Sequence, residues 1–142
     1  MPVRVQVHAA IWVGGKLVVY RHVRGGRERV SLPGGRVKDR ESLTTALERE
    51  AQEEIERDIE VGDLLFAAEV VSTASRQDVV LIFAAHLRTP ADADGLDLID
   101  PTGPEASTVL PPVLGDLANC RDGAPDLRVS RWLGNLHDSN LA

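Results

Sequence analysis

A segment without glycine or proline, from Glu41 to about Glu56, limits the possible folds of this chain more than any other feature. Alanine, leucine, glutamate, glutamine and arginine dominate it, and all five favour helices. The segments before and after it have the β-branched composition that is typical of strands. A helix between two groups of strands predicts an α/β or α+β domain with a mixed sheet.

The expected strands lie on both sides of this helix. Polar and apolar residues alternate from Val3 to Ile11, which is the period of a strand. Gly14-Gly15 and a second β-type run from Lys16 to His22 follow, so a hairpin is expected. After the helix, β-type composition returns from Ile59 to Ser72. Val79 to Ala85 is a continuous apolar run, as expected for a strand that is buried on both faces.

The remaining segments are expected to be loops and short helices. Arg24 to Arg29 and Thr89 to Pro104 are rich in residues that break regular structure, and we expect loops there. A short helix is expected from Val113 to Asn119, and a final helical segment from Leu127 to Leu136. The length of 142 residues is that of one ordinary domain, so residues 1–142 are expected to form a single domain.

Charge and composition exclude several classes of protein. With 16 basic and 22 acidic residues the net charge is −6, which argues against stable binding of nucleic acid. A single cysteine, Cys120, cannot form an internal disulfide. The chain begins without the pattern of a signal peptide, and no apolar stretch approaches the roughly 20 residues of a membrane span. We therefore expect a cytoplasmic protein without membrane attachment.

Three glutamates occupy positions on the predicted helix that should be apolar. With Leu43 set at zero and an advance of about 100° per residue, Leu47 falls at roughly 40°. On the same scale Glu50, Glu53 and Glu54 fall near about 340°, 280° and 20°, inside or beside the apolar arc. Carboxylates spaced three and four residues apart repel one another, and partial burial raises the cost. A divalent cation would remove both penalties, whereas an ordinary solvated glutamate-rich face is the alternative.

The spacing of glycine and charged residues around this helix resembles the signature of the Nudix hydrolase family. Gly35 is followed after five residues by Glu41, and after seven more by Arg49-Glu50. One aliphatic residue and one further residue then lead to Glu53-Glu54. The preceding Leu32-Pro33-Gly34-Gly35 also resembles the segment that usually leads into this signature. All the charged and glycine positions through Glu54 have the family's spacing.

The last two positions of the signature differ from the family pattern. The family has a glycine and then an aliphatic residue, and this chain has Glu56 and Arg57. The glycine normally ends the helix in a left-handed conformation, where another residue would cost about 1 kcal/mol. We therefore expect the helix to end differently, with Ile59 taking over the packing role.

The resemblance implies a fold, a chemistry and a set of metal ligands. The fold would be an α/β/α sandwich with a mixed β-sheet, and the reaction would be metal-dependent hydrolysis of a pyrophosphate bond. Mg²⁺, with Mn²⁺ as a possible substitute, would be held by Glu50, Glu53, Glu54 and the carbonyl of Gly35. Arg49 would orient the carboxylates through charge-assisted hydrogen bonds. Glu41 would anchor the loop and the start of the helix.

The general base is expected either among the metal-binding glutamates, with Glu53 as the candidate, or on a distal loop. On that loop Glu105 is preferred, because it precedes the last segment at the sheet edge. Each loop acid could equally be a solvated surface residue. The other loop candidates are Asp92, Asp94, Asp97 and Asp100.

Four arginines crowd one hairpin and loop near the signature, and they could hold the phosphates of a substrate: Arg21, Arg24, Arg27 and Arg29. Arg21 and Arg27 are the candidates for this role, although a merely solvated basic loop is equally compatible with the pattern. His22, in the same segment, is expected to be structural. The resemblance implies a small nucleotide substrate, namely a nucleoside diphosphate linked to another group, as in ADP-ribose, a nucleotide sugar or a nucleoside triphosphate.

A second hypothesis is a Nudix-like nucleotide-binding or regulatory domain with weak catalysis or none. The two departures at the end of the signature are its support, while the retained glutamates favour the enzyme. The resemblance also allows a homodimer, for which the residues themselves give no independent support.

Overall fold

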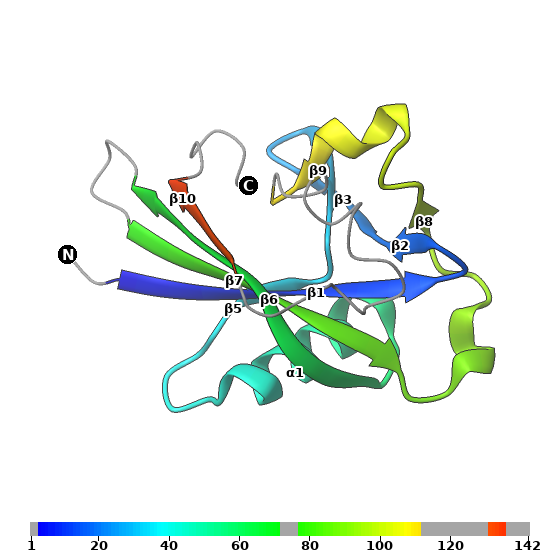
Figure 1. The fold of residues 1–142 in the computed structure, drawn as a ribbon, viewed down its shortest axis with the longest axis horizontal. Helices are drawn as coiled ribbons and strands as arrows, with labels where there is room; N and C mark the ends of the chain where they lie inside the picture. The colour runs from blue at the N-terminus through cyan, green and yellow to red at the C-terminus, as the bar shows by residue number, and fades with distance from the viewer. Residues whose placement is uncertain (1–2, 72–76, 112–130, 136–142) are drawn as a thin grey trace.

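The computed structural model describes residues 3–71, 77–111 and 131–135. They form a mixed α+β fold in which one α-helix lies on one face of the larger sheet (Figure 1). Among these residues no helix is long and apolar enough to cross a membrane. The elements in chain order are β1 (Val3–Val13), β2 (Lys16–Val18), β3 (Tyr20–Arg24), β4 (Arg27–Ser31), β5 (Gly34–Arg36), α1 (Leu43–Ile55), β6 (Ile59–Val71), β7 (Gln77–Leu87), the 3₁₀ helix η1 (Pro90–Ala93), β8 (Leu98–Ile99), the 3₁₀ helix η2 (Pro104–Thr108), β9 (Val109–Leu110) and β10 (Arg131–Asn135).

The larger sheet is mixed, as predicted. Within the described ranges its strands run in the order β10-β6-β7-β1-β2-β8, and β5 also pairs with β1. The long central pair, β1 and β7, is parallel, whereas β6 and β7 are antiparallel. β1 and β2 form the expected hairpin. A smaller sheet has the order β3-β4-β9.

The larger sheet is covered on both faces. On one face, α1 packs its buried residues Ala46, Leu47 and Ala51 into a cluster with Val7 and Ile11 of β1. On the other face, residues of β6 and β7 pack against the smaller sheet and the residue that follows β4; these are Leu65, Phe66, Val80 and Ile82 against Val30, Val109 and Leu32. Figure 1 shows α1 on one side of the sheet and β3 and β9 on the other.

Strand β7 is therefore buried on both sides, which confirms the expectation from its continuous apolar run. Val80, Ile82 and Ala84 belong to the cluster under the smaller sheet. Leu81 and Phe83 are partly buried and pack against the cluster under α1. The alternation of side chains along the strand distributes them between the two layers.

Helix α1 begins two residues later than expected, because Ser42 caps it. The Ser42 hydroxyl accepts a hydrogen bond from the Thr45 backbone N–H at 3.1 Å. Such a cap satisfies one of the N–H groups that the first helical turn leaves without an intrahelical partner. Glu41 consequently stays in the preceding loop, where its carboxylate accepts from the Lys38 backbone N–H at 3.0 Å.

Three predictions of local structure were wrong. Residues 131–135 of the expected final helix form strand β10, which gains its hydrogen bonds by pairing with β6. The expected loop from Arg24 to Arg29 is a hairpin, because Gly25 and Gly26 both take positive φ and form a two-residue turn. The expected loop from Thr89 to Pro104 contains η1 and strand β8, which pairs with β2. The short helix expected from Val113 to Asn119 lies outside the described residues.

Candidate functional site

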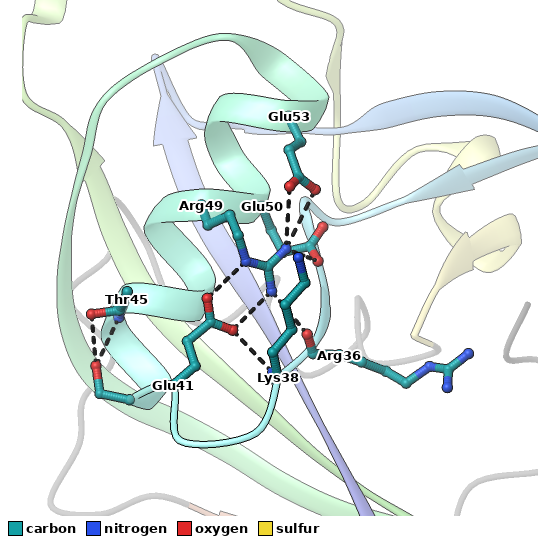
Figure 2. A network of polar contacts seen from close by, with 8 residues as sticks. Arg36, Lys38, Glu41, Thr45, Arg49, Glu50 and Glu53 are labelled. Atoms are coloured by element: carbon teal, nitrogen blue, oxygen red, sulfur yellow. Dashed lines mark hydrogen bonds and ion pairs between the residues drawn. The ribbon is translucent and has the colours of Figure 1, made fainter.

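The guanidinium of Arg49 joins the loop before α1 to the acidic side of the helix (Figure 2). Its Nε and Nη2 donate to the two carboxylate oxygens of Glu41 at 2.7 and 2.9 Å. Nη1 donates to Glu50 at 2.9 Å and lies 3.4 Å from the Glu53 carboxylate. Nη2 also donates to the Arg36 carbonyl at 3.1 Å. Arg49 and Glu41 therefore meet across eight positions of sequence.

Burial makes this arrangement more than a surface ion pair. The side chains of Arg49, Glu41 and Glu50 are only 21%, 12% and 13% exposed. The hydrogen bonds from Arg49, together with the one from the Lys38 backbone, lower the pKa of Glu41 to about 2. The hydrogen bond to Glu41 likewise raises the pKa of Arg49. Both groups are charged at neutral pH, so the loop before the helix is held against it by two parallel charge-assisted hydrogen bonds.

Glu54 lies in a different environment from Glu41. One of its oxygens accepts from the Gly34 backbone N–H at 2.8 Å. Burial raises its pKa to about 7, and the neighbouring charges of Glu50 and Glu53 act in the same direction, while the Gly34 hydrogen bond opposes them. The ionised carboxylate therefore carries a free-energy cost that a nearby positive charge would remove.

Two glycines before the helix allow the backbone to pass close to these acids. A Cβ at Gly34, which has φ of +154°, would lie 2.1 Å from the Val7 carbonyl oxygen. A Cβ at Gly35 would lie 2.6 Å from a carboxylate oxygen of Glu50. A side chain at position 34 would therefore collide with backbone, and one at position 35 would collide with the Glu50 side chain.

These two glycines should respond differently to substitution. Gly34→Ala should cost about 4 kcal/mol or more, because the β1–β5 pairing would have to shift. Gly35→Ala should cost less than about 1 kcal/mol, since only the end of the Glu50 side chain must move. Gly35→Ala should nevertheless displace Glu50 from Arg49. Urea unfolding measures the two losses of stability, and equal losses for the two variants would contradict this interpretation.

The helix carboxylates have different partners and do not form a closed cluster. Within residues 3–71, 77–111 and 131–135, no three acidic, histidine or cysteine side chains are close enough together to hold an ion. Glu50 is engaged by Arg49, Glu54 by Gly34, and Glu53 is 54% exposed. The oxygen donors and the raised pKa of Glu54 nonetheless fit a hard divalent cation.

A cavity of about 240 Å³ opens beside Glu50 and Glu54. Its lining also contains cationic and polar side chains from three strands, so that positive and negative groups face the same space. These residues are Gln6 and His8 of β1, His22 and Arg24 of β3, and Arg36 of β5. Such a cavity could accept a phosphate group together with a cation.

Of these lining residues, the sequence pattern indicated Arg24, one of the four crowded arginines, but not Gln6, His8 or Arg36. His22 and Arg24 are two positions apart on β3 and share one face, which strand periodicity could have indicated. Gln6 and His8 were counted only as the polar half of an alternating pattern. They are 8% and 7% exposed, and Gln6 donates to the buried carboxylate of Asp78 at 2.9 Å. Burial lowers the pKa of His8 to about 4, so this imidazole is neutral at pH 7.

The residues proposed on the distal side lie elsewhere. Arg21 donates to Glu105 at 2.9 Å and lies 3.9 Å from the Asp97 carboxylate. Glu105 lines neither the cavity of 240 Å³ nor a second one of about 340 Å³ on the other side of Glu54. Arg21 does line this second cavity. Arg27 is exposed at the β3–β4 turn and lines neither.

The end of α1 corrects one expectation and retains another. Glu56 adopts φ of 54° and ψ of 43°, so the helix ends in the left-handed conformation despite the missing glycine. The expectation of a different ending was wrong. Ile59 is 1% exposed and packs in the cluster under α1, as expected. The geometry that the glycine normally provides is therefore present.

Replacing Glu56 by glycine should stabilise the protein. Glycine adopts this conformation without the steric penalty of a Cβ, so Glu56→Gly should raise the free energy of unfolding by about 1 kcal/mol. Urea unfolding at pH 7 measures the change, with Glu48→Gly in the exposed middle of the same helix as the opposite control. That control should lose about 1 kcal/mol. Destabilisation by Glu56→Gly would contradict the observed backbone conformation.

Comparison with known proteins gives one family and one fold. A model of the NUDIX domain matches residues 2–108. A NUDIX hydrolase from Nitrosomonas europaea is 18% identical with a TM-score of 0.69, over 92% of this chain and 78% of that one. An ADP-ribose pyrophosphatase from Streptococcus suis is 16% identical with a TM-score of 0.62, over 91% and 98%. A MutT NUDIX hydrolase from Burkholderia pseudomallei is 23% identical with a TM-score of 0.54, over 71% and 85%. No curated protein matches the chain.

Proposed function

Because the chain belongs to the Nudix hydrolase family, we propose that it hydrolyses a pyrophosphate bond in a nucleoside diphosphate linked to another group, using a divalent cation. The observation that carries this proposal is the part-buried Glu54. Burial, with a further contribution from Glu50 and Glu53, raises its pKa to about 7 at the edge of a cavity that also contains Arg24 and Arg36. Carboxylates that repel one another beside cationic side chains are suited to binding a cation and a phosphate together.

Glu50, Glu53, Glu54 and the Gly35 carbonyl would hold the cation, with Mg²⁺ as the natural ion and Mn²⁺ as a substitute. Oxygen-only donors match the preference of both ions. When bound, the cation would neutralise charge on the phosphate oxygens and make a water molecule more acidic.

The other residues of the site orient these groups and bind the substrate. Arg49 fixes Glu50 and the loop that carries Gly35. Arg24 and Arg36 line the cavity next to Glu50 and are placed to bind substrate phosphates. Arg24 therefore has more support in this role than Arg27, and Arg21 would contact substrate only from the second cavity.

Glu53 is the favoured general base. A general base must be reached by water, and Glu53 is the most exposed of the three helix carboxylates. Its side chain is 54% exposed, against 13% for Glu50. Glu105, the alternative, is held by Arg21 at 2.9 Å and would first have to leave that ion pair. Glu53→Gln should therefore lower kcat strongly, whereas Glu105→Gln should change it little.

A substrate panel tests the proposed function. The purified protein is incubated with Mg²⁺ or Mn²⁺ and with ADP-ribose, a nucleotide sugar or a nucleoside triphosphate, and the products are separated by chromatography. At least one compound should be cut between two phosphates, with a nucleoside monophosphate among the products. If calorimetry detects binding while no compound is cut with either ion, the hydrolase proposal fails and a nucleotide-binding role replaces it.

A further inference from the structure

Arg57, which stands where the family has an aliphatic residue, binds only main-chain oxygens in the contacts described for it. Its Nη1 donates to the Ile55 and Glu56 carbonyls at 3.0 and 3.2 Å. Its Nε donates to the Asp92 carbonyl at 2.7 Å, and its Nη2 to the Asp94 carbonyl at 2.8 Å. One side chain therefore joins the end of α1 to a loop about 35 residues further along the chain.

The guanidinium suits this position for two reasons. The last carbonyls of a helix have no intrahelical partners, and the helix dipole places partial negative charge there. Arg57 satisfies such carbonyls with one edge of its planar group and reaches the loop with the other. A lysine ammonium carries the charge but cannot span both sets of acceptors in this fork geometry.

The loop that Arg57 binds is also held at its far end. The Asp97 carbonyl accepts from the Val19 backbone N–H at 3.0 Å, and the Asp97 carboxylate lies near Arg21. Residues 92–97 are thus fixed between the end of α1 and the β2–β3 region.

The cavity of about 340 Å³ lies between these attachments. Gly95, Leu96 and Asp97 form one part of its wall, while Glu54 and the end of α1 form another. Glu54 lines both this cavity and the one that contains Arg24. Any movement of loop 92–97 relative to the helix would change the space around this carboxylate.

We propose that Arg57 is a positioning residue, which fixes loop 92–97 against the end of α1 and thereby keeps Glu54 in place for the cation. This inference rests on the proposed function for the identity of the metal ligands. Arg57 would then have a structural role of its own at a position where the family signature has an aliphatic residue.

A purely local role for Arg57 would be to stabilise the left-handed Glu56. The double variant Glu56→Gly/Arg57→Gln separates the two roles, because glycine removes the local strain without restoring the contacts to Asp92 and Asp94. Arg57→Lys tests whether charge alone suffices. Arg88→Gln is the matched control, since Arg88 is exposed and lies just before the same loop.

The test measures amide hydrogen exchange and Mn²⁺ affinity of the full chain below its melting temperature. In Arg57→Gln the Leu96 and Val19 amides should exchange at least about tenfold faster, as expected from losing a hydrogen bond to a charged group. Mn²⁺ should bind severalfold more weakly. In the double variant the melting temperature should recover, while the faster amide exchange and the weaker Mn²⁺ binding remain. Arg57→Lys should behave like Arg57→Gln.

Three outcomes would overturn the inference. The first is recovery of wild-type Mn²⁺ affinity and wild-type amide exchange in the double variant. The second is wild-type Mn²⁺ affinity and exchange in Arg57→Lys. The third is that Arg88→Gln changes Mn²⁺ affinity and exchange as much as Arg57→Gln does. If the wild type cuts no substrate in the panel, the proposed function fails, yet the exchange of Leu96 and Val19 still reports whether Arg57 fixes the loop.

Discussion

Replacing Glu54 by glutamine should abolish hydrolysis and at the same time stabilise the metal-free protein. Glutamine can still accept the hydrogen bond from Gly34, so the backbone contact at 2.8 Å is retained. It lacks the negative charge needed for the cation, and the rate should fall about a thousandfold. Loss of activity together with a gain in stability would show that the Glu54 carboxylate destabilises the fold but is needed for hydrolysis.

The stability effect has a definite dependence on pH. The pKa of Glu54 in the folded protein is about 7, above the ordinary value of 4.5, so ionisation disfavours folding. The metal-free wild type should lose stability as pH rises from 4.5 through about 7, and the variant should not. With solvent screening at this partly exposed site, the advantage of the variant above pH 7 should be on the order of 1–2 kcal/mol.

Urea unfolding in a chelator between pH 4 and 8 measures this difference, and Glu48→Gln on the solvated face of α1 is the control. That control should change neither activity nor the pH profile. A Glu54→Gln variant that is less stable than the wild type at pH 8, or that retains most of the activity, would show that this carboxylate does not have the proposed role.

Replacing Arg49 by glutamine should damage both folding and activity. The change leaves Glu41 and Glu50, which are 12% and 13% exposed, without their main partner. Removing one member of such a network costs about 2–3 kcal/mol. Hydrolysis should fall about a hundredfold, because the orientation of Glu50 depends on a hydrogen bond of 2.9 Å from Arg49.

Two further variants separate charge from geometry at this position. Arg49→Lys retains the charge but cannot bind both oxygens of Glu41, so it should recover only part of the stability. The double variant Glu41→Gln/Arg49→Gln should regain stability without regaining activity. Full activity in Arg49→Lys would contradict a geometric role.

Acid titration provides an independent measure of the Arg49–Glu41 contact. The pKa of Glu41 is lowered to about 2, so the contact contributes stability that is present above pH 4.5 and is lost as pH falls toward 2. The difference in stability between the wild type and Arg49→Gln should therefore shrink over this range.

The sequence predicted those parts of the molecule that depend on local patterns. The propensity of residues 41–56 predicted α1. The position of Glu50 and Glu54 beside the apolar side agrees with their burial, whereas Glu53, placed there as well, is 54% exposed. Alternation predicted β1, and the continuous apolar run predicted the buried β7. In each case the spacing of apolar residues along the chain shows which side chains the element will bury.

The parts that depend on contacts between distant segments were not predictable in this way. Strand β10 exists through its pairing with β6, and the opposite prediction followed from residues 127–136 considered alone. The lining of the cavity requires β1, β3 and β5 to converge, so Gln6, His8 and Arg36 gave no local sign of it. The contacts of Arg57 with Asp92 and Asp94 likewise span about 35 positions.

The dependence of hydrolysis on free Mg²⁺ tests the central claim most directly. The wild type and Glu54→Gln are freed of metal with a chelator, given the best substrate from the panel, and titrated with Mg²⁺ while the products are followed by chromatography. We expect no hydrolysis in the chelator, a saturable rise in rate with Mg²⁺ for the wild type, and almost no rise for Glu54→Gln. Hydrolysis that continues unchanged in the chelator, or a Glu54→Gln variant with the same Mg²⁺ response, would contradict the central claim.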